Sequence, residues 1–196
     1  MAWAAAARTK PGEYESGDAF LVQPIPGGIL IAVIDGLGHG PTAAAAAGKA
    51  IATLNASAGA STEQLFGQCH HALRGARGAV MNVTSINQRE STLSWAGVGN
   101  VEGVLLPAGP ALAAKHLISV NDFLGSASRL RVHPATHNLQ ANDLLLFATD
   151  GIRGGFTAGL NRADTTQRIA DAILAGYCTD NDDALVLVAR YLGGAR

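Results

Sequence analysis

The sequence has few charged and aromatic residues and no long hydrophobic run, and each shortage excludes a class of protein. Charged residues make up 15% of the 196 positions and nearly cancel, to a formal net charge of −1. No global field therefore attracts nucleic acid or an anionic membrane surface. No basic run is interleaved with aromatic residues, and no stretch approaches the roughly 18 apolar residues that a membrane span needs. We expect neither nucleic acid nor a membrane as a partner.

Cysteine is also scarce. Cys69 and Cys178 are far apart and form neither a CxxC motif nor a disulfide framework. This usage is typical of a reducing compartment. The first residues, "MAWAAAARTK", are apolar over a short stretch and lack a leading basic region, so they make a poor signal peptide. We expect a cytoplasmic protein.

Hydrophobic residues, by contrast, make up 48% of the chain, which is enough for a substantial core. We find no linker and no internal repeat, and expect a single domain over residues 1–196. Apolar runs and helical spacing predict the following elements. Strands are expected at 18–23, 29–35, 79–87, 91–99, 101–107, 129–139, 143–150 and 182–192, helices at 41–55, 61–76 and 165–177, and a loop at 108–128. Runs of strands beside helix pairs predict an α+β layered fold, with 79–107 as an antiparallel meander.

Four carboxylates lie at the ends of predicted strands. Asp35 and Asp150 end their strands, and Asp18 and Asp182 begin theirs. In an antiparallel sheet the start of one strand lies beside the end of its neighbour, so all four can meet at one edge. Their mutual repulsion would be relieved by a hard divalent cation, because Mg²⁺ and Mn²⁺ prefer oxygen ligands. The Gly36 carbonyl can also approach such an ion closely.

A simpler interpretation stays open for each of these residues. An aspartate at a strand end is usually a turn or cap residue. "FATDG" alone can form an Asx turn, and "NDD" can form a solvated turn. The residues alone therefore leave both a metal site and a set of turns as interpretations.

The stretch "IAVIDGLGHG" also has the strand–glycine–helix order of a nucleotide-binding loop. The details disfavour this interpretation. The dinucleotide fingerprint needs glycine where the chain has Pro41, and Asp35 would repel a pyrophosphate. The position of the acidic ribose ligand holds Asn55, and no Gly-Lys-Ser/Thr sequence follows the glycines.

Five motifs in order resemble the metal-dependent type-2C (PPM) serine/threonine phosphatases. They are "SGDAF", "VIDGLGHGPTA", "GVGN", "LLLFATDGI" and "DDALVLVAR", spread from Asp18 to Leu192. "RGARGAVMNV" and "GVGNVEGVL" further resemble the RsbX-type stressosome phosphatases within the SpoIIE-like bacterial branch. The resemblance implies a four-layer α-β-β-α sandwich of two antiparallel sheets flanked by helix pairs.

The resemblance also implies a site with two divalent cations, Mn²⁺ or Mg²⁺. Asp35 matches the aspartate that bridges both ions, and Gly36 matches the residue that gives a carbonyl ligand. The remaining ligands and the neighbouring residues of the site follow from the same motifs. Ligands are implied at Asp18, Asp150 and Asp182, and supporting residues at Asp183, Gly99 and Asn100.

The implied reaction is attack of a metal-activated water on phosphoserine or phosphothreonine. Two departures from the family pattern matter. Many relatives have histidine directly after the Asp-Gly pair, where this chain has Leu37, so His39 is our candidate for the general acid. Relatives outside the branch carry a phosphate-gripping arginine before the first aspartate, and the candidates here are Arg8 and Lys10.

For the RsbX-type branch, the implied substrates are phosphorylated STAS-domain proteins of the stressosome, whose dephosphorylation resets the stress signal. A SpoIIE-like phosphatase of an anti-anti-sigma factor is the second candidate. A phosphoprotein-binding module with weak catalysis belongs to another class, and four intact carboxylates argue against it. We expect a monomer, with "NDFLGS" (121–126) shaping the substrate entrance.

Overall fold

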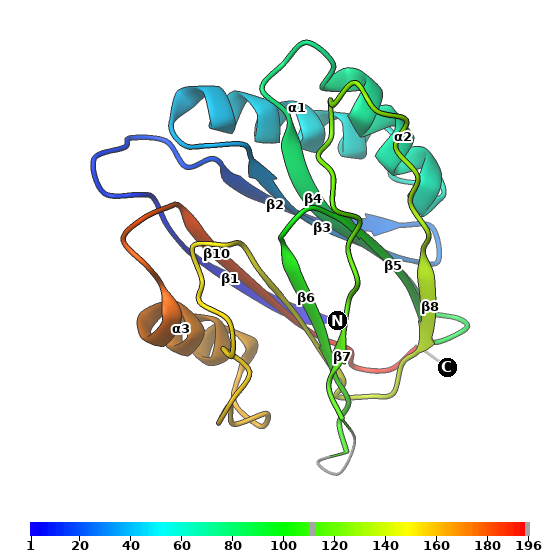
Figure 1. The fold of residues 1–196 in the computed structure, drawn as a ribbon. Coiled ribbons are helices and arrows are strands. Elements are labelled where there is room, and N and C mark those ends of the chain that lie inside the picture. The colour runs from blue at the N-terminus through cyan, green and yellow to red at the C-terminus, as the bar shows by residue number, and fades with distance from the viewer. Residues whose placement is uncertain (110–112, 195–196) are drawn as a thin grey trace.

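The computed structural model describes residues 1–109 and 113–194, and two five-stranded antiparallel sheets lie face to face in it (Figure 1). One sheet, called sheet A here, has the order β1-β10-β9-β6-β7. Its strands are β1 (Ala2–Arg8), β10 (Ala184–Arg190), β9 (Leu144–Ala148), β6 (Glu102–Leu106) and β7 (Lys115–His116). The other, sheet B, has the order β2-β3-β4-β5-β8. Its strands are β2 (Asp18–Ile25), β3 (Gly28–Gly36), β4 (Ala79–Asn87), β5 (Thr92–Val98) and β8 (Ala135–Asn138).

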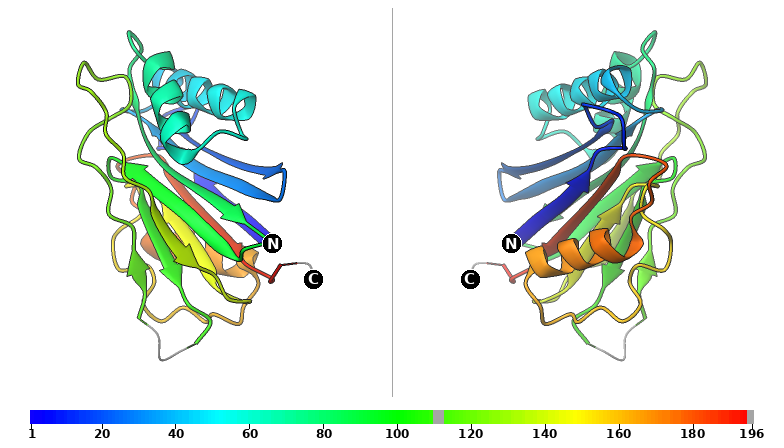
Figure 2. Two further views of the ribbon diagram at one scale, coloured as in Figure 1. Left: turned by 90° about the vertical axis from the view of Figure 1, so that its right-hand side faces the viewer. Right: turned by 90° about the vertical axis from the view of Figure 1, so that its left-hand side faces the viewer.

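Helices cover the outer face of each sheet (Figure 2). α1 (Pro41–Ala56) and α2 (Thr62–Ala72) pack on sheet B, and α3 (Thr166–Tyr177) packs on sheet A. Local signals start each helix: proline in the first turn of α1, a Ser61 capping box for α2 and a Thr165 cap for α3. None of these helices, nor any other within the described ranges, is long and apolar enough to cross a membrane.

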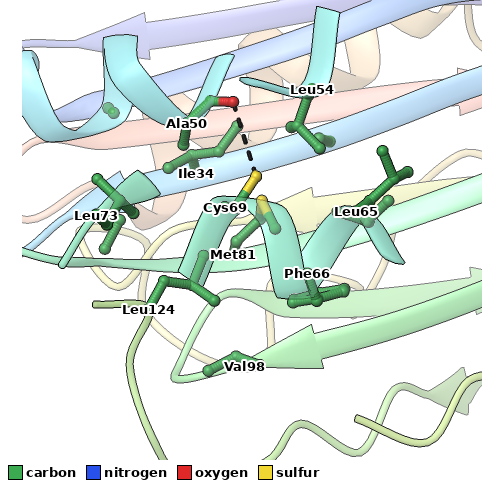
Figure 3. Close-up of a cluster of buried hydrophobic side chains, with 14 of the residues drawn as sticks. Ile34, Ala50, Leu54, Leu65, Phe66, Cys69, Leu73, Met81, Val98 and Leu124 are labelled. Atoms are coloured by element: carbon green, nitrogen blue, oxygen red, sulfur yellow. Dashed lines mark hydrogen bonds between the residues drawn. The ribbon is translucent and has the colours of Figure 1, made fainter. Parts of the chain in front are cut away.

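Three hydrophobic clusters separate the four layers. The first lies between α1, α2 and sheet B, where the small alanines of α1 allow a close approach and Cys69 packs against the helix (Figure 3). The second fills the space between the sheets around Trp95 and Phe147. The third lies between sheet A and α3. The predicted α-β-β-α sandwich is therefore confirmed.

Several element predictions were wrong in detail. β1 was not predicted, because its alanine-rich sequence lacks the β-branched residues typical of strands. The stretch 79–107 is not one meander, since β6 leaves sheet B and pairs with β9 in sheet A. The resemblance implied a helix pair on each side, whereas sheet A is covered by α3 alone within the described residues.

Other boundaries differ by a few residues. α2 ends at Ala72 instead of 76, before a segment in which Gly75 and Gly78 have positive φ. The edge strand predicted at 129–139 is confirmed only as β8, which begins directly after Pro134. The loop predicted at 108–128 contains the short β7, and residues 110–112 of that loop lie outside the described residues.

Candidate metal centre

Asp18 and Asp35 come together because β2 and β3 pair directly. Their antiparallel register places the two aspartates opposite each other, at the first residue of β2 and near the last of β3. Like charges directly opposite on neighbouring strands repel. Neither the fold nor the continuous apolar run of β3 requires a carboxylate at Asp35, so its presence needs a functional explanation.

Asp150 and Asp182 approach the same place from sheet A. Asp150 follows β9, and Asp182 lies two residues before β10, its neighbour in the sheet. Both carboxylates act electrostatically on Asp18 and on Asp35. The four predicted strand-end aspartates therefore gather at one end of the sandwich, two from each sheet.

The electrostatics of this cluster are unfavourable for ionised carboxylates. Burial raises the pKa of Asp35 to about 9, and the charges of Asp18, Asp150 and Asp182 add to this effect. Burial also raises the pKa of Asp18 to about 7, although a hydrogen bond from Thr149 lowers it in part. The pKa of Asp150 is raised in the same direction by burial and by Asp182. Among the described residues, no lysine or arginine forms an ion pair with any of the four.

As they stand, the side chains do not form a closed ligand cage. Within residues 1–109 and 113–194, no group of three carboxylate, histidine or cysteine side chains is placed so that it could hold a metal ion. Three of the four carboxylates accept a hydrogen bond from another donor. Thr149 donates to Asp18 at 2.7 Å, Asn100 donates to Asp150 at 2.8 Å, and the Asp183 amide donates to Asp182 at 2.9 Å.

The donor set nevertheless fits a hard divalent cation. Carboxylates with raised pKa values and no basic partner need positive charge to become ionised at neutral pH. Gly17, which has no side chain, leaves space beside the Gly36 carbonyl. A Cβ on Gly17 would lie 3.3 Å from the Gly36 carbonyl oxygen and 2.8 Å from the Ala43 side chain. The predicted carbonyl ligand at Gly36 therefore faces a residue without a side chain.

Asp183, predicted as a supporting residue, holds a loop. It is 3% exposed, and its two carboxylate oxygens accept the backbone N–H groups of Lys10 and Gly17, each at 2.8 Å. One buried carboxylate thus fixes both ends of the segment 10–17, which joins β1 to β2. This loop and the turn before β10 lie together at the left of Figure 1.

Thr149 is a site residue that the sequence analysis missed. It is 1% exposed, and its hydroxyl donates to Asp18 while accepting the Leu185 N–H at 2.9 Å. It therefore joins Asp18 of sheet B to β10 of sheet A. Its position directly before Asp150 in "FATDG" was the only signal that could have found it.

Gly99 and Asn100 lie where the motif predicts, at the end of β5. Gly99 has φ of +89°, and a Cβ there would lie 2.1 Å from the Val80 side chain, so only glycine fits this turn. The turn directs Asn100 to Asp150. Asn100 also lines a groove of about 570 Å³. The other lining residues are Leu37, Val80, Gly99, Ser119, Asn121, Asp122 and Phe123.

The remaining candidates have other partners. His39 is exposed and its Nδ1 lies 2.5 Å from Oε1 of Glu13, so the structure gives it an orienting carboxylate. Arg8 donates to Asp180 at 2.8 Å and to the Thr179 carbonyl. The backbone N–H of Lys10 donates a hydrogen bond to the Asp183 carboxylate. The roles of His39 as acid and of Arg8 or Lys10 as phosphate ligands stay predictions.

Comparisons with known proteins agree with this architecture. Residues 25–192 match the family model of stage II sporulation protein E (SpoIIE). The chain is 24% identical over 182 residues to the phosphoserine phosphatase RsbX of Bacillus subtilis (strain 168), covering 91% of this chain and 88% of RsbX.

Two solved structures are similar over nearly the whole chain. One comes from work on the bacterial stressosome as a modular system adapted to control secondary messenger signalling. It has a TM-score of 0.87 and 33% identity, covering 96% of this chain and 98% of that one. The other is RsbX in complex with magnesium, with a TM-score of 0.85 and 21% identity, covering 95% and 92%. The second likeness shows a shared fold.

Proposed function

Since this chain belongs to the stage II sporulation protein E (SpoIIE) family, we propose that it is a metal-dependent protein phosphatase that hydrolyses phosphoserine or phosphothreonine. The carboxylate cluster supports this proposal more than any other observation. Four aspartates from two sheets meet without a basic partner in the described residues, and burial raises the pKa of three of them. A protein that only binds phosphoproteins does not need such a cluster.

Asp18, Asp35, Asp150 and Asp182, with the Gly36 carbonyl, would hold two divalent cations, Mn²⁺ or Mg²⁺. Such cations lower the pKa of a bound water toward 7 and offset the charge that develops on the phosphoryl group. The reaction forms a bond from a water oxygen to phosphorus and breaks the bond to the serine or threonine oxygen, which leaves with a proton.

Hydrogen bonds within the chain orient the proposed metal ligands and the loop beside them. Thr149 orients one oxygen of Asp18, and Asn100 orients one oxygen of Asp150. Asp183 fixes the loop beside them. His39, paired with Glu13, is our candidate for the group that protonates the leaving oxygen. Preorganised positions of this kind are what phosphoryl transfer requires of a protein.

The groove beside Asn100 is proposed as the entrance for the polypeptide that flanks the phosphorylated residue. Three residues of "NDFLGS", from Asn121 to Phe123, line it together with Leu37. We propose phosphorylated STAS-domain proteins of the stressosome as the substrates. The similarity to RsbX and to a chain from stressosome work supports this choice. We further propose that residues 1–196 act as one domain, as a monomer in the cytoplasm.

Hydrolysis of an aryl phosphate by the native chain and by Asp35→Asn, with and without Mn²⁺, tests the activity. We expect turnover that requires Mn²⁺ and is lost in the variant. A native chain without Mn²⁺-dependent turnover would refute the proposal and favour a binding module.

A second assay tests the substrate. Phosphorylated STAS-domain stressosome proteins and a phosphorylated anti-anti-sigma factor are incubated with the enzyme in parallel, and phosphate release is compared. Faster release from the stressosome proteins is expected. Faster release from the anti-anti-sigma factor would instead assign the SpoIIE-like role.

A further inference from the structure

Arg77 lies beside the loop that follows Asp35. It directly precedes Gly78, whose carbonyl accepts the Leu37 N–H at 3.1 Å. The next residue, Ala79, pairs with Gly36, and Val80 pairs with Asp35. The backbone at Arg77 therefore runs beside the loop that follows Asp35, at the end of sheet B that carries Asp18 and Asp35.

The side chain of Arg77 extends over that loop. A Cβ placed on Gly38 would lie 2.5 Å from Nη2 of Arg77, so the guanidinium occupies the space above Gly38. Nη1 donates to the Thr42 hydroxyl at 3.0 Å, in the first turn of α1. Two points of contact, one over the loop and one on the helix, define where the positive charge lies.

This positive charge has no carboxylate to neutralise it in the described part of the chain. Arg77 is exposed, and none of the ion pairs includes it. Arg8 differs, because it pairs with Asp180. Arg77 has five N–H donors in a planar fork, of which the hydrogen bond to Thr42 uses one.

Two divalent cations would only balance the charges of the four aspartates, so a phosphate monoester dianion that enters the site meets no net positive charge there. A guanidinium over the neighbouring loop supplies that attraction, and its fork matches the oxygens of a phosphoryl group. We propose that Arg77 binds the phosphoryl group of the substrate, in place of Arg8 and Lys10. This inference rests on the proposed function.

The test uses the full chain loaded with Mn²⁺ and compares single variants. Arg77→Met removes the charge and keeps most of the stem, while Arg77→Lys keeps a charge. Arg74→Met is the matched control, since Arg74 is exposed on the neighbouring turn. Lys10→Met tests the rival cation. Binding of inorganic phosphate is measured by calorimetry, and kcat and KM are measured with an aryl phosphate.

We expect Arg77→Met to weaken phosphate binding and to lower kcat/KM, each by about 10- to 100-fold, as for loss of a charge-assisted hydrogen bond. Arg77→Lys, which keeps the charge but not the fork, should recover only part of the loss, and Arg74→Met should match the native chain. Equal phosphate affinity in Arg77→Met and Arg74→Met would overturn the inference, as would a large loss in Lys10→Met alone.

The variant Thr42→Val distinguishes phosphate binding by Arg77 from a purely structural role of Arg77. This variant removes the hydroxyl that Arg77 contacts and keeps the guanidinium. If Thr42→Val and Arg77→Met lose phosphate affinity only together with an equal loss of thermal stability, Arg77 acts by holding α1 and the inference fails. The phosphate-binding measurement also stands apart from turnover. A native chain without hydrolysis refutes the proposed function, while weaker phosphate binding in Arg77→Met still supports the role of Arg77.

Discussion

At the scale of single residues, the Thr149 hydroxyl makes two hydrogen bonds, one as donor and one as acceptor. It donates to Asp18 across the space between the sheets and accepts the Leu185 N–H within sheet A. Because Leu185 is buried, its N–H cannot turn to water instead when the hydroxyl is lost. The hydrogen bond also fixes the orientation of the Asp18 carboxylate toward a bound cation.

We therefore predict that Thr149→Val, which keeps the shape and removes the hydroxyl, weakens Mn²⁺ binding about 10- to 100-fold. It should also lower the free energy of unfolding by about 1–3 kcal/mol, because the Leu185 N–H loses its acceptor. Calorimetric titration with Mn²⁺ and urea unfolding measure the two effects. Thr149→Ser, which keeps the hydroxyl, should restore metal affinity. Equal affinities in Val and Ser variants would contradict the orienting role.

Asp35 makes stability depend on pH when a chelator is present. Its pKa of about 9 and that of Asp18 of about 7 lie above the value of about 4 for unfolded aspartate, mainly because of burial. The native state thus keeps protons that the unfolded chain releases. The contribution of these two groups to the free energy of unfolding is greatest below about pH 4 and falls as pH rises toward 9.

We predict that Asp35→Asn flattens this dependence and is more stable than the native chain at pH 8.5 in EDTA. Urea unfolding at several pH values measures this. Asp171→Asn, on the exposed surface of α3, serves as the control and should follow the native curve. A variant less stable than the native chain at every pH would show that the Asp35 carboxylate is not a source of repulsion.

At the scale of elements, the start of α1 lies against the end of β3. A Cβ on Gly36 would lie 2.1 Å from the Ala43 carbonyl oxygen, which is backbone and cannot turn away. The presence of glycine at 36 therefore sets how close the helix comes to Asp35. Gly48 in the middle of the same helix is exposed and has no atom within 4 Å of an added Cβ.

These two glycines form a matched pair. Gly36→Ala should displace α1, lower stability by more than 2 kcal/mol (roughly, as for an overpacked core) and reduce Mn²⁺-dependent turnover. Gly48→Ala should raise stability by about 0.5–1 kcal/mol through helix propensity and leave turnover unchanged. Thermal unfolding and aryl phosphate hydrolysis measure both. Similar behaviour of the two variants would refute the close-approach argument.

The helices were predictable because local signals specify them: Pro41 starts α1, Ser61 caps α2 and Thr165 caps α3. β3 and β10 were predictable from continuous apolar runs. β1 was not, since alanine has no strand preference and its pairing with β10 is a contact between the two ends of the chain. Likewise, no local signal shows that β6 changes sheet.

The same division holds for the site. The aspartates were found because each ends or begins a recognisable strand. The bond from Thr149 to Asp18 joins residues 131 positions apart, and the contact of Arg77 with Thr42 depends on where α2 ends. Such partners depend on tertiary packing, so strand patterns and spacing could not predict them.

At the scale of the whole molecule, the proposed cations would join two sheets that otherwise meet through a largely apolar core and the hydrogen bond from Thr149 to Asp18. Asp18 and Asp35 belong to sheet B, and Asp150 and Asp182 flank strands of sheet A. Ligands drawn from both sheets make metal binding favour the assembled sandwich over either sheet alone. Binding to the native state alone then raises the stability of the whole fold.

We predict one cooperative thermal transition that Mn²⁺ moves upward as a unit. At a metal concentration 100 times Kd the stabilisation is about 2.7 kcal/mol, which corresponds to about 5–10 °C in a chain of this size. The double variant Asp35→Asn with Asp150→Asn removes one proposed ligand from each sheet and should lose the shift, whereas Asp171→Asn should keep it. Scanning calorimetry with and without Mn²⁺ measures all three chains. An undiminished shift in the double variant would show that the metal binds elsewhere. Two separate thermal transitions, of which Mn²⁺ moves only one, would show that the cations do not couple the sheets.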